Sequence, residues 1–135
     1  QTLTHGNRNL DTNTQNKIAQ AVGDAQKSGA PATLVVRSPY TYYAARLYHA
    51  PNYPVKFLFY KDLAKMGSTK PLYDHPEDSV PNFDKLNKVW LIGEDKYAVV
   101  PPQGGHWIEK KRHIEYDDVT QKPIAYAVYY ERIAR

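Results

Sequence analysis

The chain has 135 residues, of which 18 are basic and 14 acidic, so its net charge is +4. This length suits one domain with a packed core, and a 41% share of apolar residues excludes a wholly disordered chain. The lack of cysteine excludes disulfides, thiolate metal sites and cysteine nucleophiles, and the scattered, mildly basic charge argues against nucleic-acid binding, which needs a denser basic surface.

A helix is predicted near the N-terminus. Residues 1–10 are polar and are expected to be extended. Over residues 11–28 the apolar side chains recur at helical spacing. They form one stripe of four residues: Ile18, Ala21, Val22 and Ala25. Gly29 follows at the position where a residue in the left-handed conformation commonly ends a helix.

Two short runs of β-branched and apolar residues predict buried strands on either side of a second helix. These strands cover residues 32–37 and 55–60. Between them, Ser38 can cap a helix whose first residue is Pro39. We expect this helix to continue over residues 40–50 and to end before the next proline.

The second half predicts one more buried strand and a hairpin. Residues 61–86 are interrupted by glycine and prolines and are expected to be irregular. "KVWLIG" at 88–93 predicts a buried strand, and alternation in 112–118 and 124–132 predicts two antiparallel strands. This order predicts an α/β fold: a small sandwich with a mostly parallel sheet, flanking helices and a C-terminal antiparallel hairpin. We expect residues 1–135 to form a single α/β domain.

The familiar reactive motifs are missing from the sequence. Neither G-x-G-x-x-G nor G-x-x-x-x-G-K-[ST] occurs, which excludes nucleotide binding by those loops. Ser38 follows a predicted strand, but Arg37 and Pro39 do not suit the sharp turn of a nucleophile elbow, so capping is its simpler role. The start of the second helix could still hold an anion through its N–H groups. No two histidines have the spacing of a zinc-binding helix.

An acidic stretch, "DHPEDS", lies in the irregular segment. His75 stands beside Asp74, Glu77 and Asp78, and these groups could chelate a divalent cation loosely. The spacing lacks the alternating oxygen ligands and central glycine of an EF-hand loop, so a solvated acidic loop is the favoured interpretation. We therefore predict no metal site, no cofactor and no catalytic residue in this chain.

Tyrosines crowd the second predicted helix, at Tyr40, Tyr42, Tyr43 and Tyr48. Their spacing spreads them over more than one face, so some should pack on the sheet and others should stand at its rim. Rim tyrosines can stack on sugars or lie at a membrane interface. Packing without any ligand is the simpler alternative.

The predicted parallel sheet indicates where a ligand would bind. Open α/β sheets hold ligands beyond the carboxyl ends of their strands. The side chains that follow the three predicted strands are therefore the candidate ligand-binding residues. They are Ser38, Tyr40, Tyr42, Tyr43, Lys61, Asp62, Glu94 and Asp95.

Five stretches follow one another along most of the chain. They are "GNRN", "VVRSPYTYYAARLY", "YPVKFLFY", "VWLIG" and "YDD…KPIAYAVYYER". Their order resembles the soluble C-terminal domain of bacterial polytopic glycosyltransferases of the GT-C type, which are related to the dolichyl-phosphate-mannose protein mannosyltransferases. The resemblance implies that this chain is a fragment of a longer membrane protein, and that the catalytic acidic residues lie in a preceding, many-spanning part.

For this chain, the resemblance implies a non-catalytic accessory domain on the extracytoplasmic face of the cell membrane. The parent protein would transfer sugar from a lipid-linked donor. The expected partners are the membrane-embedded part of the same chain and a carbohydrate or protein acceptor, with no nucleic acid among them. Two alternatives stay open: a free-standing small α/β hydrolase or transferase, and a cell-surface protein-interaction module.

Overall fold

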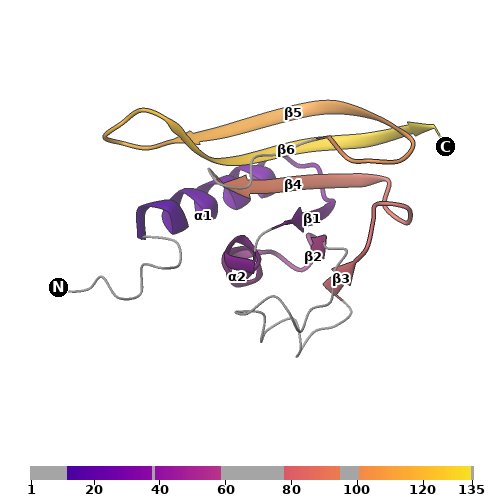
Figure 1. Cartoon of the computed structure of the whole chain (residues 1–135), viewed down its shortest axis with the longest axis horizontal. Coiled ribbons are helices and arrows are strands. Elements are labelled where there is room, and N and C mark those ends of the chain that lie inside the picture. The colour runs from indigo at the N-terminus through magenta and orange to yellow at the C-terminus, as the bar shows by residue number, and fades with distance from the viewer. Residues whose placement is uncertain (1–11, 38, 59–77, 95–100, 135) are drawn as a thin grey trace.

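The computed structural model describes residues 12–37, 39–58, 78–94 and 101–134 (Figure 1). These residues form two helices and six strands. They are α1 (Thr12–Lys27), β1 (Thr33–Val36), α2 (Pro39–Tyr48), β2 (Val55–Leu58), β3 (Ser79–Val80), β4 (Lys88–Glu94), β5 (His106–Tyr116) and β6 (Pro123–Ala134).

All six strands belong to one sheet, in the order β3-β2-β1-β4-β6-β5. The four strands from β3 to β4 run parallel to one another, and β6 pairs antiparallel with both β4 and β5. The predicted α/β fold with a mostly parallel sheet and a C-terminal antiparallel hairpin is confirmed. The hairpin extends the sheet beyond β4, with β5 at the outer edge (Figure 1).

The strand β3 lies at the end of the stretch for which the sequence predicts only irregular structure. It has two residues: Ser79 pairs with Phe57 of β2, and Val80 pairs with Leu58. Two residues are too few to show the alternation by which a strand is predicted from sequence. The second helix is also shorter than predicted, since α2 ends at Tyr48 rather than at residue 50.

The helix α1 buries the apolar stripe that predicts it. All four residues of the predicted stripe are fully buried: Ile18, Ala21, Val22 and Ala25. The helix ends at Lys27, and Gly29 follows with a φ of 80°, a conformation that glycine adopts without steric cost. The predicted left-handed ending at this glycine is confirmed.

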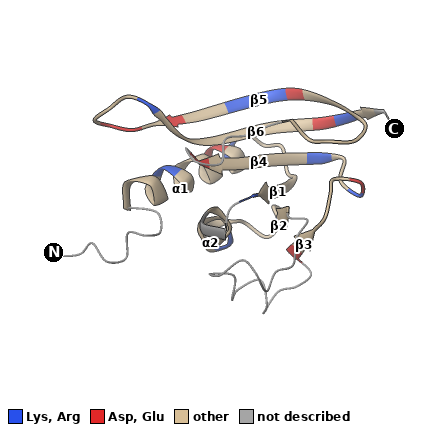
Figure 2. Cartoon of the chain, viewed as in Figure 1, with Lys and Arg blue, Asp and Glu red and all other residues tan. Residues whose placement is uncertain are grey.

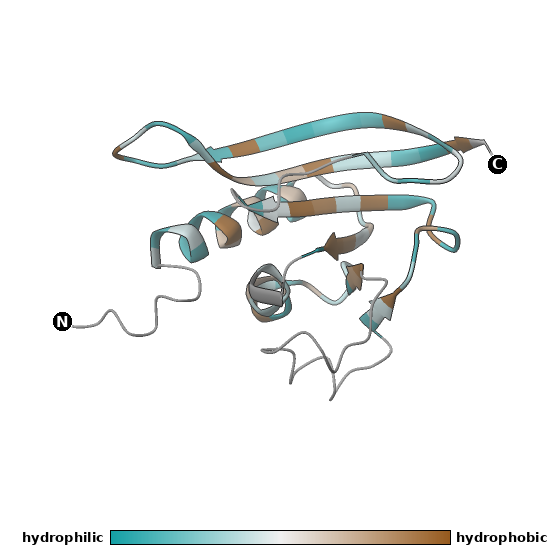
Figure 3. Ribbon diagram, viewed as in Figure 1, coloured by the Kyte–Doolittle hydropathy of each residue, from teal (hydrophilic) through white to brown (hydrophobic). Residues whose placement is uncertain are grey.

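In the described part of the chain, both helices cover the same face of the sheet. Their buried side chains pack against alternate strand residues: Leu34, Val36, Phe57, Trp90, Ile92, Ala127 and Tyr129. The opposite face has its own apolar cluster: Val35, Val89, Leu91, Val128 and Tyr130, with Phe83 from the turn before β4. Figure 3 shows apolar residues along β1 and β4, whereas β5 is mostly hydrophilic.

A buried aromatic stack joins α1 to the hairpin. The Trp90 ring stacks with the rings of both His113 and Tyr129, with centroid separations of 5.8 and 5.0 Å. Its indole nitrogen donates a hydrogen bond to the Ala30 carbonyl at 2.9 Å. This stack therefore ties β4, β5 and β6 to the segment that follows α1.

Polar contacts link the other end of α1 to the turn of the hairpin. Lys17 makes an ion pair with Asp118 at 2.9 Å, and the Asn13 amide donates to the Asp117 carboxylate, also at 2.9 Å. Asp117 in turn accepts the backbone N–H of Val119 at 2.7 Å. The turn between β5 and β6 is therefore stabilised by a hydrogen bond within the turn and by contacts with α1.

Candidate functional site

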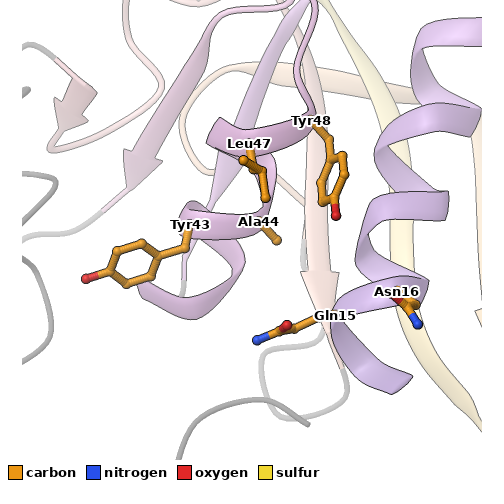
Figure 4. Close-up of a pocket in the computed structure, with 6 residues that line it drawn as sticks. All are labelled: Gln15, Asn16, Tyr43, Ala44, Leu47 and Tyr48. Carbon is orange, nitrogen blue, oxygen red and sulfur yellow. The ribbon is translucent and has the colours of Figure 1, made fainter. Parts of the chain in front are cut away.

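A groove lies between the first turn of α1 and the outer side of α2 (Figure 4). It encloses a cavity of about 160 Å³. Six side chains line it: Gln15, Asn16, Tyr43, Ala44, Leu47 and Tyr48. We call this surface the α1–α2 groove.

The groove forms because α2 buries one face against the sheet and exposes large side chains on the other. Tyr42 and Ala45 face the sheet and are buried. The other side of the helix presents Tyr43, Leu47 and Tyr48, which are 37%, 75% and 49% exposed. Three large apolar or aromatic side chains on one exposed helix face are more than isolated surface residues, and such clusters mark interaction sites.

The side chains of the groove differ in direction. In Figure 4, Tyr48 and Gln15 point into the space between the helices from opposite sides, while Tyr43 points away from α1. Ala44 faces the same space with only a methyl group and is 8% exposed. A small side chain at this position leaves the space open between the tyrosine and the amide.

No charged side chain lines the groove among the described residues. The lining combines aromatic, aliphatic and amide groups. Figure 2 shows charged residues concentrated on β5 and β6 instead. The nearby cations have partners elsewhere, since Lys17 pairs with Asp118 and Arg46 lies 3.5 Å from the Asp78 carboxylate.

The side chains of three of the eight candidate binding residues are described, and of these three only Tyr43 lines the groove. Tyr42 is 1% exposed, and its hydroxyl donates a hydrogen bond to Asp78 at 2.6 Å. Glu94 is 4% exposed at the carboxyl end of β4. The Tyr40 side chain is not described, and four of the predicted residues lie outside the described residues: Ser38, Lys61, Asp62 and Asp95.

The interpretation of the acidic stretch as a solvated loop is wrong for Asp78. This residue is 6% exposed. Its carboxylate accepts the Tyr42 hydroxyl and lies 3.5 Å from Arg46 and 4.0 Å from Lys56. Two cations and a hydroxyl replace the water that a buried carboxylate loses, which is why it can be buried. The other acidic residues of that stretch lie outside the described residues.

The described groups with displaced pKa values belong to the β5–β6 hairpin rather than to the groove. Burial raises the pKa of the Glu115 carboxyl to about 7, and the neighbouring Asp24 carboxyl contributes. Burial also raises the pKa of Tyr129 and of Tyr130. A displaced acid in a cleft is the usual sign of acid–base catalysis. The described lining of the α1–α2 groove contains none, so the alternative of a small hydrolase gains no support there.

Metal ligands and membrane spans can be assessed for the described residues. No cluster of three or more histidine, aspartate or glutamate residues there could hold a metal ion. Within the same residues, neither helix is long and apolar enough to cross a membrane.

Comparisons with known proteins place the chain in no family. No protein-family model matches it, and no curated protein matches it. Among solved structures, it is similar to a dihydrofolate reductase from Enterococcus faecalis complexed with NADP(H) and RAB-propyl. The identity is 9%, the alignment covers 82% of each chain, and the TM-score is 0.28. A likeness of that size says nothing about the ligands or activity of this chain.

Sequence reasoning missed most of the groove because the groove joins two helices that are distant along the chain. Tyr43 and Leu47 stand four residues apart on α2, and this spacing was a sign of a second apolar face. No sequence pattern marks Gln15 and Asn16 as part of a groove, because polar residues in the first turn of a helix are common. Only the placement of α1 beside α2 brings them to the tyrosines.

Proposed function

We propose that the chain is a non-catalytic, carbohydrate-binding accessory domain of an integral-membrane glycosyltransferase that uses a lipid-linked sugar donor. The domain stands on the extracytoplasmic face of the cell membrane, beside the membrane-embedded part of the same protein. The observation that carries the binding role is the α1–α2 groove, where Tyr48 faces Gln15 across an uncharged cavity. The link to a glycosyltransferase rests on the sequence resemblance.

The groove combines the two kinds of group that sugar recognition requires. A tyrosine ring has an electron-rich face, against which the C–H groups of a sugar ring can pack through weak hydrogen bonds. A side-chain amide has both donors and an acceptor, as a sugar hydroxyl does. Tyr48 supplies the ring at 49% exposure, and Gln15 and Asn16 supply the amides.

The absence of a displaced acid from the described lining of the groove supports binding rather than turnover. Catalysis of glycosyl transfer calls for positioned carboxyl groups, and the raised pKa of Glu115 belongs to the α1–β5 contact instead. In this proposal the chemistry takes place in the membrane part, and the domain holds the acceptor or the growing glycan near it.

The test is titration of the chain with a panel of oligosaccharides, followed by backbone amide chemical shifts. We expect changes centred on α1 and α2. At the same glycan concentration Tyr48→Ala should strongly reduce them, because it removes the ring that faces the cavity. Tyr116→Ala is the matched control, since Tyr116 is similarly exposed at 48% but lies on β5. Shifts that stay unmoved with every glycan would refute the proposal.

A further inference from the structure

Resting on the proposed function, we infer that the α1–α2 groove selects a single uncharged sugar ring and rejects glycans that carry carboxylate or sulfate groups. The ring packs against Tyr48, and its hydroxyls bond to the amides of Gln15 and Asn16. The ligand class of the groove is therefore the neutral hexopyranose unit.

The charge of the described lining limits which sugars the groove can accept. All six lining side chains are uncharged. An anionic sugar that entered the cavity would lose water around its charge without gaining a cation from the described lining, and burying an unpaired charge is costly. Two cations adjoin lining residues in the sequence, and both have acidic partners: Lys17 is 2.9 Å from Asp118, and Arg46 is 3.5 Å from Asp78. A neutral sugar meets no such penalty.

The size of the cavity limits how many sugar units it can hold. Its volume of about 160 Å³ is roughly five times the ~30 Å³ that one water occupies in the liquid. This space suits one monosaccharide unit rather than several. In addition, Tyr48 points into the gap while Tyr43 points away from α1 (Figure 4), so one aromatic ring of the described lining faces the cavity.

The two side-chain amides match the hydrogen-bonding groups of a neutral sugar. Gln15 and Asn16 are neighbours on α1, and both are exposed. An amide donates through its nitrogen and accepts through its oxygen, which matches hydroxyl groups that do both. A lysine or arginine at these positions would only donate, and an ionised carboxylate would only accept.

The experiment compares neutral manno- and gluco-oligosaccharides with oligogalacturonate and a sulfated oligosaccharide, by calorimetry and amide chemical shifts. We expect the neutral glycans to bind and to shift residues of α1 and α2, with Tyr48→Ala weakening binding about tenfold or more. Tyr48→Phe should bind nearly as well as the unaltered chain, because it keeps the ring. The acidic glycans should bind at least tenfold more weakly.

A charge variant tests the lining directly. Gln15→Lys should improve oligogalacturonate binding relative to the neutral glycans, whereas Gln20→Lys, on the same helix but outside the groove, should not. If oligogalacturonate binds the unaltered chain at the groove as tightly as the neutral glycans, the inference is overturned and the proposed function stands. If no glycan of either kind binds, the proposed function fails, and this inference fails with it.

Discussion

The Tyr42 hydroxyl donates a 2.6 Å hydrogen bond to the Asp78 carboxylate, and both residues are buried. This contact joins α2 to the residue that precedes β3. Arg46, one turn further along α2, lies 3.5 Å from the same carboxylate. The edge of the parallel sheet is therefore attached to α2 through one buried acid.

The first prediction concerns this contact. Tyr42→Phe should lower the free energy of unfolding by about 2 kcal/mol, because it leaves a buried charged acceptor without its closest donor. Urea denaturation followed by far-UV circular dichroism measures the change. Tyr48→Phe is the control, since its hydroxyl belongs to a half-exposed side chain, and it should change the stability by less than about 0.5 kcal/mol. Equal stabilities for the two variants would contradict this account of Asp78.

The second prediction is a substitution that should raise the free energy of unfolding. Thr41 is fully buried on α2, and its hydroxyl has no hydrogen-bond partner among the described residues. An unsatisfied buried hydroxyl is unfavourable, so Thr41→Val, which keeps the shape, should stabilise the chain by about 1 kcal/mol. Thr120→Val should not stabilise it, because the Thr120 hydroxyl accepts a hydrogen bond from the Lys122 N–H at 3.3 Å. The thermal unfolding temperatures of both variants test this prediction. An unfolding temperature of Thr41→Val that does not exceed that of the unaltered chain would contradict it.

Local patterns predicted the elements that bury their own apolar residues. The stripe from Ile18 to Ala25 specified α1 and its buried face, and the run at 88–93 specified β4, because burial and spacing are local properties of the sequence. The alternation of Tyr126, Val128 and Tyr130 specified one face of β6, and all three contribute to the cluster on the face without helices.

Features that depend on pairing between distant residues could not be predicted in this way. Asp78 resembled a solvated acid because its partner hydroxyl lies 36 residues away, on Tyr42. The α1–α2 groove was missed for the same reason, since Gln15 meets Tyr48 only once both helices have packed on the sheet. The rule for parallel sheets pointed instead to the strand ends, where the described Glu94 is buried.

The third prediction concerns Arg132, whose guanidinium holds three segments together. It donates to the carbonyls of Phe83 at 2.7 Å, Leu86 at 3.1 Å and Gly104 at 3.0 Å. Its central carbon lies 4.3 Å from the centre of the Trp107 ring. Lysine cannot reproduce this planar fork, so Arg132→Lys should cost about 2–4 kcal/mol of stability.

The matched control for Arg132→Lys is Arg112→Lys on β5. Arg112 makes a bidentate pair with Glu109, at 2.7 and 3.0 Å, but both side chains are exposed. Exposed pairs contribute little, about 0–1 kcal/mol. In guanidinium chloride denaturation, the unfolding midpoint of Arg132→Lys should therefore be clearly lower than that of Arg112→Lys. Similar midpoints would mean that the Arg132 contacts do not stabilise the fold.

The fourth prediction is a dependence of stability on pH that originates at Glu115. In the folded chain the pKa of this carboxyl is raised from 4.5 to about 7 by burial, with help from the Asp24 carboxyl, while Lys17 opposes the shift. The folded state therefore holds the proton more tightly than the unfolded state. Its contribution to stability is complete below pH 4.5, and it is lost as the pH rises through 7.

Stability measured at pH 5 and at pH 8.5 tests this sign. A shift of this size corresponds to about 3 kcal/mol, and partial exposure to solvent should reduce the measured loss to about 1–2 kcal/mol. Glu115→Gln cannot ionise, so it should flatten the profile and make the chain more stable than the unaltered one at pH 8.5. Glu109→Gln on the same strand should not, because Arg112 lowers the pKa of Glu109 and its ionised form is already the favoured one. A steeper loss of stability toward high pH in Glu115→Gln would show that the proton resides elsewhere.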